Sequence, residues 1–451
     1  MRKLLLLFFF CQAYVGYSQQ QSGASFNGDT IRLNYGRPYT RCATMEHLAW
    51  MEKHDTGYKA KLIASQKLMD EWRSRHKPDS TTIDTEYTIP IVVHVIWNTA
   101  AEKISVAQVQ SEIPVLNAAY NRQNADTTNT PAPFKSVAAN MHITFCLATT
   151  DPYGSATDGI VYKQTSSTGF YAGFNTVKYP SLGGDTAWDV NRYLNIWVCN
   201  LQGGSLGFSE FPTTPLDNTF GSVILYTAFG TTGTLIVPFN LGGTTAHEIG
   251  HLLNLHHPWG DDGGLCPGQN GGHDDGAADT PPEGNGNLDK YTNNGNSNGA
   301  TYGCPTFPYT DNCSTTYPGI MFNNYMEYTD DSCYNLFTND QKSIVMAALH
   351  GPLAYLIKSN RCGPAGINEY SFNAGISVFP NPTNGKITIQ FAEDRPEVCS
   401  LDIYNVLGEK IYATKTNHST EVDISNSANG VYLLRISGNN VASVKKIVLN
   451  R

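Results

Sequence analysis

Apolar residues recur along the middle of the chain in runs and spacings that predict alternating strands and helices. The run Tyr87–Trp97 is almost continuously apolar and rich in β-branched residues, which predicts a buried strand. Apolar runs at residues 141–147, 193–200 and 221–226 predict three more strands. Apolar positions at helical spacing between Ser105 and Asn121 predict a helix that Ser105 caps. This order of elements predicts an α/β (α+β) domain with a twisted mixed sheet.

The segment before this domain has a different pattern. Residues 45–75 are rich in Lys, Glu and Ala, and they predict helical structure with basic residues at its end. We interpret residues 19–80 as a helical pro-segment with basic cleavage sites. The alternative is a helical extension that stays attached. The central domain is expected to span residues 81–362.

The C-terminal part alternates between short apolar strands and turn signals. Residues 376–451 contain four such runs, separated by Asn-Pro, Leu-Gly and Asn-Gly turns, which predicts a small β-sandwich. A Gly- and Asn-containing linker at residues 363–375 separates it from the central domain.

The first 18 residues have the pattern of a signal peptide. A basic start is followed by the apolar run Leu4–Phe10 and small residues near position 18, and the run is too short for a lasting membrane span. We therefore expect a soluble exported protein. Loss of Cys11 with the signal leaves nine of the ten cysteines, so export favours disulfides but at least one thiol stays outside them. The net charge of −9, without a long Lys/Arg run, argues against a nucleic-acid partner.

The residues His247–His257 carry the strongest chemical signal. His247 and His251 are four apart, so on a helix both imidazoles reach one metal ion, and Glu248 lies where its carboxylate can hold a metal-bound water. Asn254 is expected to end the helix in the left-handed conformation and let His257 return as a third ligand. Three histidines with an open fourth position indicate a catalytic zinc site. The alternative is a helix with surface histidines.

A cysteine in the pro-segment is a candidate fourth ligand. Cys42 lies in the sequence Arg-Cys-Ala-Thr, and a thiolate is a strong zinc ligand. We expect it to fill the open position and keep the enzyme latent. The alternative is a disulfide with some other cysteine.

Residues 258–320 are dominated by Gly, Asn, Asp and Pro and have few apolar residues to form a core. Four cysteines in and after this stretch can make two bridges, of roughly 3–4 kcal/mol each. The crowded oxygens of residues 273–281 suit calcium, and the alternative is a solvated acidic turn. The four cysteines are Cys266, Cys304, Cys313 and Cys333.

The chain from about residue 85 to 362 resembles the bacterial and archaeal members of the pappalysin family of metzincin metalloproteases. The resemblance is carried by His247–His257, by the Asn-Tyr-Met-Glu-Tyr turn at residues 324–328, by Cys333 and by the helix start at Phe337. It implies that Met326 forms the Met-turn beneath the zinc. It also implies that Tyr328 is a tyrosine that can reach the zinc or the oxyanion.

Several further roles are implied by this resemblance alone. Asp275 and Thr280 would be calcium ligands, assisted by main-chain oxygens near Asp274 and Ala278. Cys266 would pair with Cys313, and Cys304 with Cys333, while the fates of Cys146, Cys199, Cys362 and Cys399 stay open. The Arg-Cys-Ala-Thr segment is similar to the latency motif of the family, with alanine in place of glycine.

One position departs from the family pattern. Arginine-directed members carry an aspartate in the specificity pocket just before the fourth cysteine. Here that position is Ser332, with Asp331 beside it. A missing acid would weaken selection of Arg or Lys after the cut bond.

Residues 376–451 resemble the type A C-terminal sorting domain of the type IX secretion system. Val378–Pro382, Tyr404–Gly408 and Val444–Leu449 carry this likeness. It implies outer-membrane secretion machinery as a partner, a secreted or cell-surface location, and removal of the domain.

These observations together predict a secreted zinc endopeptidase that cuts protein or peptide substrates. Glu248 would activate a zinc-bound water, Tyr328 would stabilise the oxyanion, and Cys42 would maintain latency. One alternative is a non-catalytic, zinc-containing adhesive or binding protein. The other is a zinc amidase that acts on cell-wall peptides.

Overall fold

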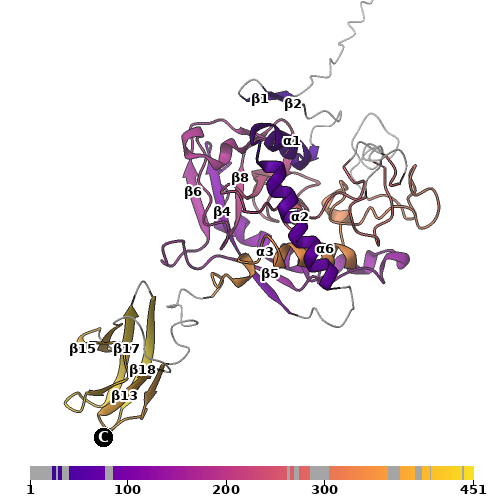
Figure 1. Cartoon of the computed structure of the whole chain (residues 1–451). Helices are drawn as coiled ribbons and strands as arrows, with labels where there is room; N and C mark the ends of the chain where they lie inside the picture. Colours follow the sequence, from indigo (N-terminus) through magenta and orange to yellow (C-terminus); the bar gives the residue numbers. More distant parts are fainter. Residues whose placement is uncertain are drawn as a thin grey trace, which may run out of the picture. The chain divides into compact units, whose positions relative to one another are not determined.

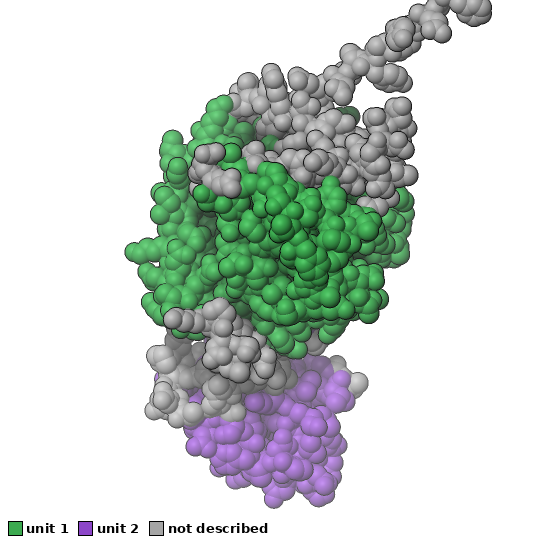
Figure 2. All heavy atoms as spheres, turned by 90° about the vertical axis from the view of Figure 1, so that its right-hand side faces the viewer, with its two compact units in different colours: residues 1–362 green, residues 363–451 purple. Residues whose placement is uncertain are grey.

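The computed structural model describes residues 23–26, 29–32, 40–76, 85–261, 265–268, 274–284, 304–363, 376–391, 399–406, 408–438 and 441–451. The chain forms two compact units, Met1–Cys362 and Gly363–Arg451, coloured separately in Figure 2. The division falls where the central domain was expected to end. The expected signal peptide and nearly all of the expected linker lie outside the described residues.

The first unit is built around strand β4 (Tyr87–Trp97), whose central residues are all buried. β4 pairs in parallel with β5 (Ile143–Leu147), β6 (Ile160–Gln164) and β8 (Leu194–Cys199). The continuous apolar run that predicted a buried strand therefore lies inside the sheet, between β8 on one side and β5 and β6 on the other (Figure 1). β6 was not predicted, because three of its five residues are exposed and its apolar pattern is short.

The strands on the far side of β8 from β4 form the edge of the sheet nearest the histidine motif. β11 (Gly221–Leu225) is parallel to β8, and β10 (Ser205–Phe208) is antiparallel to β11. β3 (Thr40–Cys42), from the predicted pro-segment, adds to β10 in parallel. In the described residues this gives a mixed sheet in the order β3-β10-β11-β8-β4-β5, with β6 also on β4, which confirms the predicted fold class.

Three helices of the central domain contribute residues to one core with the sheet (Figure 1). α3 (Val106–Tyr120) begins where Ser105 accepts the Gln108 N–H, as predicted. α4 (Gly243–Leu252) carries the histidine motif, and Asn254 beyond its end has a φ of 71°, the left-handed conformation expected there. α6 (Asn339–His350) starts with a capping box between Thr338 and Gln341. Their apolar faces share one buried core with β4 and β8.

The predicted pro-segment forms two helices where one helical run was expected. α1 (Thr44–His54) and α2 (Tyr58–Arg75) are separated at Asp55, whose carboxylate accepts the Gly57 N–H. α2 packs along α6, with Met69 buried in the main core (Figure 1). Within the part of the chain that the structure describes, no helix combines the length and apolar character needed to cross a bilayer.

Three disulfides tie together the described residues of the first unit. Cys266 pairs with Cys313 and Cys304 with Cys333, as the family resemblance implied, and Cys146 pairs with Cys362. The buried cysteines outside these pairs are Cys42, Cys199 and Cys399. Shorter elements of the unit are β1 (Gly23–Phe26), β2 (Asp29–Arg32), β7 (Phe170–Tyr171), β9 (Leu201–Gln202), η1 (Ala125–Asn129), η2 (Ala132–Phe134), η3 (Asn175–Lys178), η4 (Pro180–Leu182), η5 (Tyr226–Ala228), η7 (Asp331–Cys333) and η8 (Leu356–Lys358).

The second unit is a two-sheet β structure. One sheet has the order β12-β13-β16 and the other β15-β14-β17-β18 among the described residues. Alternate residues of both sheets, such as Ile389 and Leu434, meet in one core, as in the predicted sandwich. The strands are β12 (Ile376–Phe379), β13 (Lys386–Phe391), β14 (Cys399–Asn405), β15 (Lys410–Thr416), β16 (Thr420–Asp423), β17 (Gly430–Gly438) and β18 (Val441–Leu449).

Candidate metal and catalytic site

Helix α4 and the turn after it bring three imidazoles to one point. His257 Nε2 lies 3.3 Å from His247 Nε2 and 3.2 Å from His251 Nε2. The Sγ of Cys42 lies 3.4 Å from His251 Nε2. All four side chains are buried, and their ligand atoms lie within 4.8 Å of one another.

This spacing fits a tetrahedral zinc ion. Bonds of about 2.0–2.1 Å to nitrogen and 2.3 Å to sulfur place neighbouring ligand atoms roughly 3.3–3.6 Å apart. Each imidazole directs Nε2 to the centre because its Nδ1 is already bound elsewhere. His247 Nδ1 lies 2.8 Å from the Tyr325 carbonyl, and His251 Nδ1 lies 2.8 Å from the Leu255 carbonyl. The arrangement leaves Nε2 of each ring as the free metal-binding atom.

The third imidazole has a charged partner. His257 Nδ1 lies 2.5 Å from Asp261 Oδ1, and Trp259 stacks on the ring at 4.5 Å between centroids. The sequence analysis missed Asp261, although an acid four residues beyond a ligand is a signal that could have found it. His256 stacks on Phe211 and lies outside the cluster, so it is a bystander to the cluster.

Two of the three candidate ligands, His247 and His251, are shifted toward the neutral form. Burial, and then the neighbouring imidazoles, lower the pKa of His247 well below its usual value. Burial and the charge of His257 do the same to the pKa of His251. Neutral imidazoles are the metal-binding form.

Glu248 follows the first ligand and is buried beside the cluster. Its Oε2 accepts hydrogen bonds from Ser209 Oγ at 2.9 Å and from Thr44 Oγ1 at 3.2 Å. Burial raises the pKa of this carboxyl to about 7, against the opposing effect of these hydrogen bonds. A group with this pKa can both accept and release a proton near neutral pH. Ser209 lacks a recognisable local pattern, and sequence reasoning missed it. Thr44 is the last residue of the Arg-Cys-Ala-Thr segment, but its contact with Glu248 was not predicted.

The two residues that the family resemblance singled out lie close to the imidazoles. A Cβ added at Gly250 would lie 2.4 Å from Met326 Sδ, so the methionine packs directly against the active-site helix. The Tyr328 ring lies 4.8 Å from the His257 ring between centroids. The Tyr328 hydroxyl donates to the carbonyl of Cys42 over 3.1 Å.

The segment before Cys42 occupies a second pocket beside the metal site. Arg41 Nη2 donates to Asp331 Oδ1 over 2.8 Å, and its guanidinium lies 4.6 Å from the Tyr334 ring centroid and 5.2 Å from that of Phe239. Asp331 is buried, whereas Ser332 is exposed. The carboxylate that Arg41 contacts is therefore that of Asp331, because η7 turns this side chain inward.

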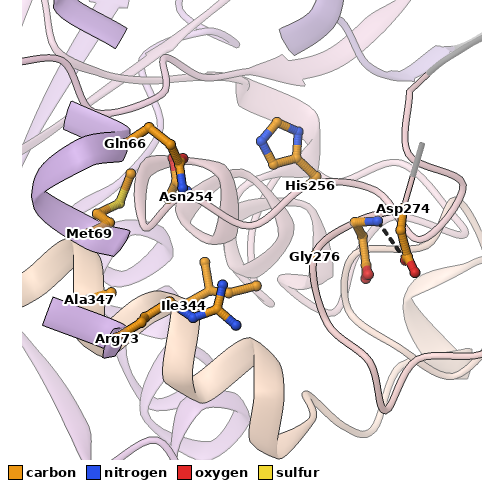
Figure 3. Close-up of a pocket in the computed structure, with 10 residues that line it drawn as sticks. Gln66, Met69, Arg73, Asn254, His256, Asp274, Gly276, Ile344 and Ala347 are labelled. Carbon is orange, nitrogen blue, oxygen red and sulfur yellow. Dashed lines mark hydrogen bonds between the residues drawn. The ribbon is translucent and has the colours of Figure 1, made fainter. Parts of the chain in front are cut away.

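The residues considered for calcium lie in one loop against α6. Asp275 is buried and accepts hydrogen bonds from Thr280 Oγ1 to both carboxylate oxygens, each at 2.9 Å. Burial raises the pKa of Asp275 to about 8. Asp274 accepts the Asp275 N–H, and the Ala278 N–H donates to Asp340. A cavity of about 210 Å³ lies between this loop, α2 and His256 (Figure 3).

Known protein families match two parts of the chain. Residues 183–350 match the family described as pregnancy-associated plasma protein-A, and residues 377–450 match the secretion system C-terminal sorting domain. An extracellular metalloprotease of Podospora anserina is 33% identical over 155 residues, which are 33% of this chain and 44% of the relative. One of Pyricularia oryzae is 34% identical over 157 residues, 34% of this chain and 46% of the relative. The chain spans about half the length of the curated relatives it matches.

Solved structures extend the similarity. Mature mirolysin of Tannerella forsythia, solved with a cleaved peptide, is 42% identical, with a TM-score of 0.54 over 62% of this chain and 99% of that one. A promirolysin mutant from the same organism is 37% identical, with a TM-score of 0.59 over 70% of this chain and 97% of that one. The pro-form match reaches further along this chain than the mature one. Relatives this similar over nearly their whole length show that the chain belongs to the pappalysin family of metzincin metalloproteases.

Proposed function

We propose that this chain is a secreted zinc endopeptidase that hydrolyses peptide bonds in proteins and peptides and is kept latent by its own pro-segment. The observation that carries the proposal is the convergence of three Nε2 atoms beside the buried Glu248. His247, His251 and His257 would hold the ion, and their spacing suits its tetrahedral preference.

The residues around the centre support hydrolysis. When bound, zinc supplies Lewis-acid chemistry that polarises a carbonyl and makes water nucleophilic near neutral pH. Glu248 takes a proton from the attacking water and returns it to the leaving amine. The Tyr328 hydroxyl, once it no longer donates to Cys42, can donate to the developing oxyanion. A single hydrogen-bond donor of this kind stabilises the transition state by on the order of 3 kcal/mol.

The pro-segment explains latency. Its thiol lies at the fourth ligand position, and Thr44 Oγ1 donates to Glu248, the proposed proton acceptor. The strand β3 occupies the edge β10, where a substrate strand would otherwise pair. Residues 40–44 thus cover the metal site, the proton acceptor Glu248 and the edge strand β10. Peptide hydrolysis requires that these residues are released.

The pocket around Asp331 supports selection of a basic residue after the cut bond. Arg41 lies in it as a stand-in for a substrate side chain, held by one carboxylate and two aromatic faces. A guanidinium is well suited to both kinds of contact. We therefore propose that mature enzyme cuts before Arg or Lys.

A calcium ion at Asp275 and Thr280 is part of the proposal. A buried carboxyl whose pKa is raised to about 8 is stabilised in its charged form by a bound cation. Main-chain oxygens near Asp274 and Ala278 would complete the oxygen ligands. The sorting-domain match at residues 377–450 supports export through outer-membrane secretion machinery, with the first 18 residues as signal peptide.

The decisive test is the substitution Glu248→Gln in activated protein. We expect the variant to retain one zinc ion per chain and to lose casein hydrolysis, and wild-type hydrolysis to stop when a zinc chelator is added. Unchanged turnover with normal zinc content would refute the role of Glu248. Absence of casein hydrolysis by the wild type would favour an adhesive protein. Hydrolysis confined to a peptidoglycan substrate would favour an amidase.

A further inference from the structure

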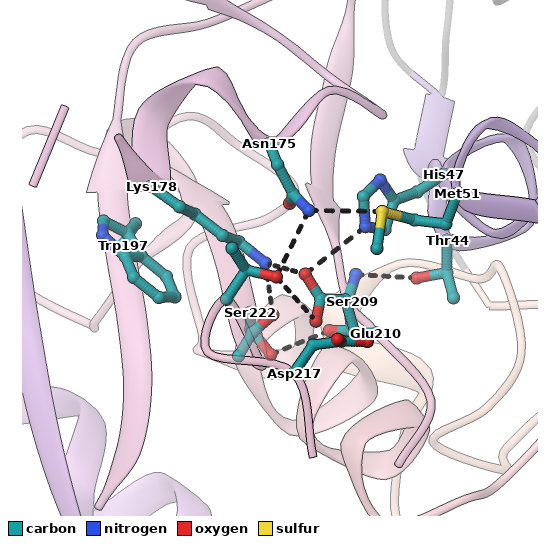
Figure 4. Close-up of polar contacts among 12 residues, drawn as sticks. Thr44, His47, Met51, Asn175, Lys178, Trp197, Ser209, Glu210, Asp217 and Ser222 are labelled. Carbon is teal, nitrogen blue, oxygen red and sulfur yellow. Dashed lines mark hydrogen bonds and ion pairs between the residues drawn. The ribbon is translucent and has the colours of Figure 1, made fainter. Parts of the chain in front are cut away.

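A buried ionic cluster joins η3 to the residues that follow β10, and it has no part in the chemistry described above (Figure 4). Lys178 Nζ donates to Glu210 Oε1 over 2.6 Å and to the Gly221 carbonyl over 3.2 Å. The side chains of this pair are 0% and 2% exposed. Although burial alone would raise it, the charge of Lys178 and the contact with His47 lower the pKa of Glu210 to about 2. Glu210 is therefore a carboxylate at neutral pH.

The predicted pro-segment covers this cluster with side chains from α1 and α2. His47 Nδ1 lies 2.7 Å from the Gly173 carbonyl, and His47 Nε2 lies 3.5 Å from Glu210 Oε1. Lys61 Nζ donates to Asp217 Oδ1 over 2.6 Å. Figure 4 shows His47 directed toward Glu210. Release of the pro-segment removes all three contacts.

The two sides of this contact differ in their chemistry. The pro-segment contributes a lysine ammonium and an imidazole. The remaining chain contributes acceptors, which are the Gly173 carbonyl and the carboxylates of Glu210 and Asp217. Lys178 balances one of the two carboxylates. The surface left behind therefore has one negative charge in excess and free acceptor oxygens.

The order of residues in the pro-segment indicates where Glu210 lies relative to the metal site and the Asp331 pocket. Arg41 precedes Cys42 and lies in the Asp331 pocket, whereas His47 follows Cys42 and lies against Glu210. The two sites thus lie on opposite sides of the metal centre along the chain. If the Asp331 pocket takes the residue after the cut bond, the Glu210 side takes residues before it. Cys42 ends β3 and His47 lies in the first turn of α1, so two non-helical steps and three helical steps separate them. This separation corresponds to roughly two or three residues of extended peptide.

We propose that Glu210 and Asp217, with the Gly173 carbonyl, form a subsite for a basic side chain of the substrate, two or three residues before the cut bond. This inference rests on the proposed function, because it assumes that a peptide replaces the pro-segment along β10. The enzyme would then select substrates with a basic residue on each side of the bond. Asp217 and Glu210 act on specificity alone and have no part in the hydrolytic step.

Hydrolysis of a matched peptide series by the activated full chain tests this inference. All peptides carry Arg after the cut bond, and the second or third residue before it is Lys, Gln or Glu. We expect kcat/KM to be about fivefold higher for Lys than for Gln, the size of a partly exposed ion pair, and lowest for Glu. The difference should lie in KM and should shrink as salt is added, because salt screens such charges.

Two variants and one control test whether the Lys preference depends on the carboxylates of this cluster. Asp217→Asn, at a side chain that is 20% exposed, should reduce the ratio of kcat/KM for the Lys peptide to that for the Gln peptide. Asp189→Asn, at a side chain that is 42% exposed and outside the cluster, is the matched control and should keep the preference. Because Glu210→Gln alone would leave Lys178 buried without its partner, the double variant Glu210→Gln/Lys178→Met is used. It should weaken the preference, because one of the two carboxylates that contact the basic side chain is removed while Asp217 remains.

The outcomes separate the inference from the proposed function. Equal hydrolysis of the Lys, Gln and Glu peptides would overturn the subsite and leave the endopeptidase assignment intact. A Lys preference that persists in both Asp217→Asn and the double variant would also overturn it. Hydrolysis of none of the peptides, with zinc bound, would overturn the proposed function itself.

Discussion

The guanidinium of Arg41 and the carboxylate of Asp331 form an ion pair at 2.8 Å, with both side chains almost fully buried and 290 residues apart in the chain. The second carboxylate oxygen of Asp331 accepts the N–H groups of Leu241 and Gly243 at the start of α4. One acid therefore connects the pro-segment to the helix that carries two of the candidate metal ligands. Arg41 holds the pro-segment in place beside the thiol of Cys42.

We predict that Arg41→Gln shortens the latent phase of the full-length protein. Removal of one partner of a buried ion pair typically costs about 3–5 kcal/mol, and here that loss destabilises the docked pro-segment relative to the released one. The onset of casein hydrolysis should come earlier than in the wild type. Arg75→Gln is the matched control, because Arg75 is 72% exposed and lies in the same segment. An unchanged latent phase in Arg41→Gln would show that the pair does not hold the pro-segment.

Asp261 provides a test of the metal site that does not depend on turnover. Its carboxylate fixes the ring of His257 through a contact of 2.5 Å. Loss of such an outer partner typically weakens metal binding about 10- to 100-fold. Asp261→Asn should therefore release zinc to a competing chelator at lower chelator concentrations than the wild type. The exposed Asp158→Asn serves as control, and equal retention of zinc in both variants would contradict the assignment.

The local part of the site could be predicted from sequence, whereas the long-range part could not. His247, Glu248 and His251 lie on one helical turn, where residue spacing alone fixes which side chains meet. The contact between Arg41 and Asp331 depends on how distant segments pack. Nothing in the local pattern showed that Asp331 turns inward and Ser332 outward.

The same distinction holds for the fold. β4 was predicted because its apolar run is long and buried on both faces. β10 was missed because its four residues include a glycine and are too few to show a period. Because β10 was missed, the pairing of β3 along this edge could not be predicted. The break between α1 and α2 was missed because it depends on the hydrogen bond between Asp55 and Gly57.

If calcium binds at Asp275, its removal by a chelator should lower the thermal stability of the protein. A ligand present at about 100 times its dissociation constant stabilises a fold by roughly 2.7 kcal/mol, and each kcal/mol moves Tm by about 2–4 °C in a domain of 150–250 residues. EGTA should therefore lower the Tm of the wild type by several degrees and leave Asp275→Asn unaffected. Asp274→Asn is the matched control, because only a main-chain oxygen near Asp274 is expected to bind. An EGTA effect that persists in Asp275→Asn would place the ion elsewhere.

Glu112 on α3 predicts a loss of stability as pH rises. This side chain is fully buried, its Oε2 accepts the Gly230 N–H, and burial raises its pKa to about 8. The unfolded chain releases this proton near pH 4.5, so between about pH 4.5 and 8 the folded state binds more protons than the unfolded state. The free energy of unfolding should therefore fall with pH, by at most about 1.4 kcal/mol per pH unit from this group.

Urea unfolding of the full chain, measured at several pH values between 5 and 8, tests this prediction. Glu112→Gln keeps an oxygen that can accept the Gly230 N–H but cannot ionise, so its stability should depend less on pH than that of the wild type. Glu86→Gln, at an exposed position, should retain the wild-type dependence. If Glu112→Gln and the wild type lose stability with equal slopes, Glu112 is already ionised in the folded protein. Its negative charge would then be stabilised by the N–H dipoles near the start of α4, where Gly242 lies against its carboxylate.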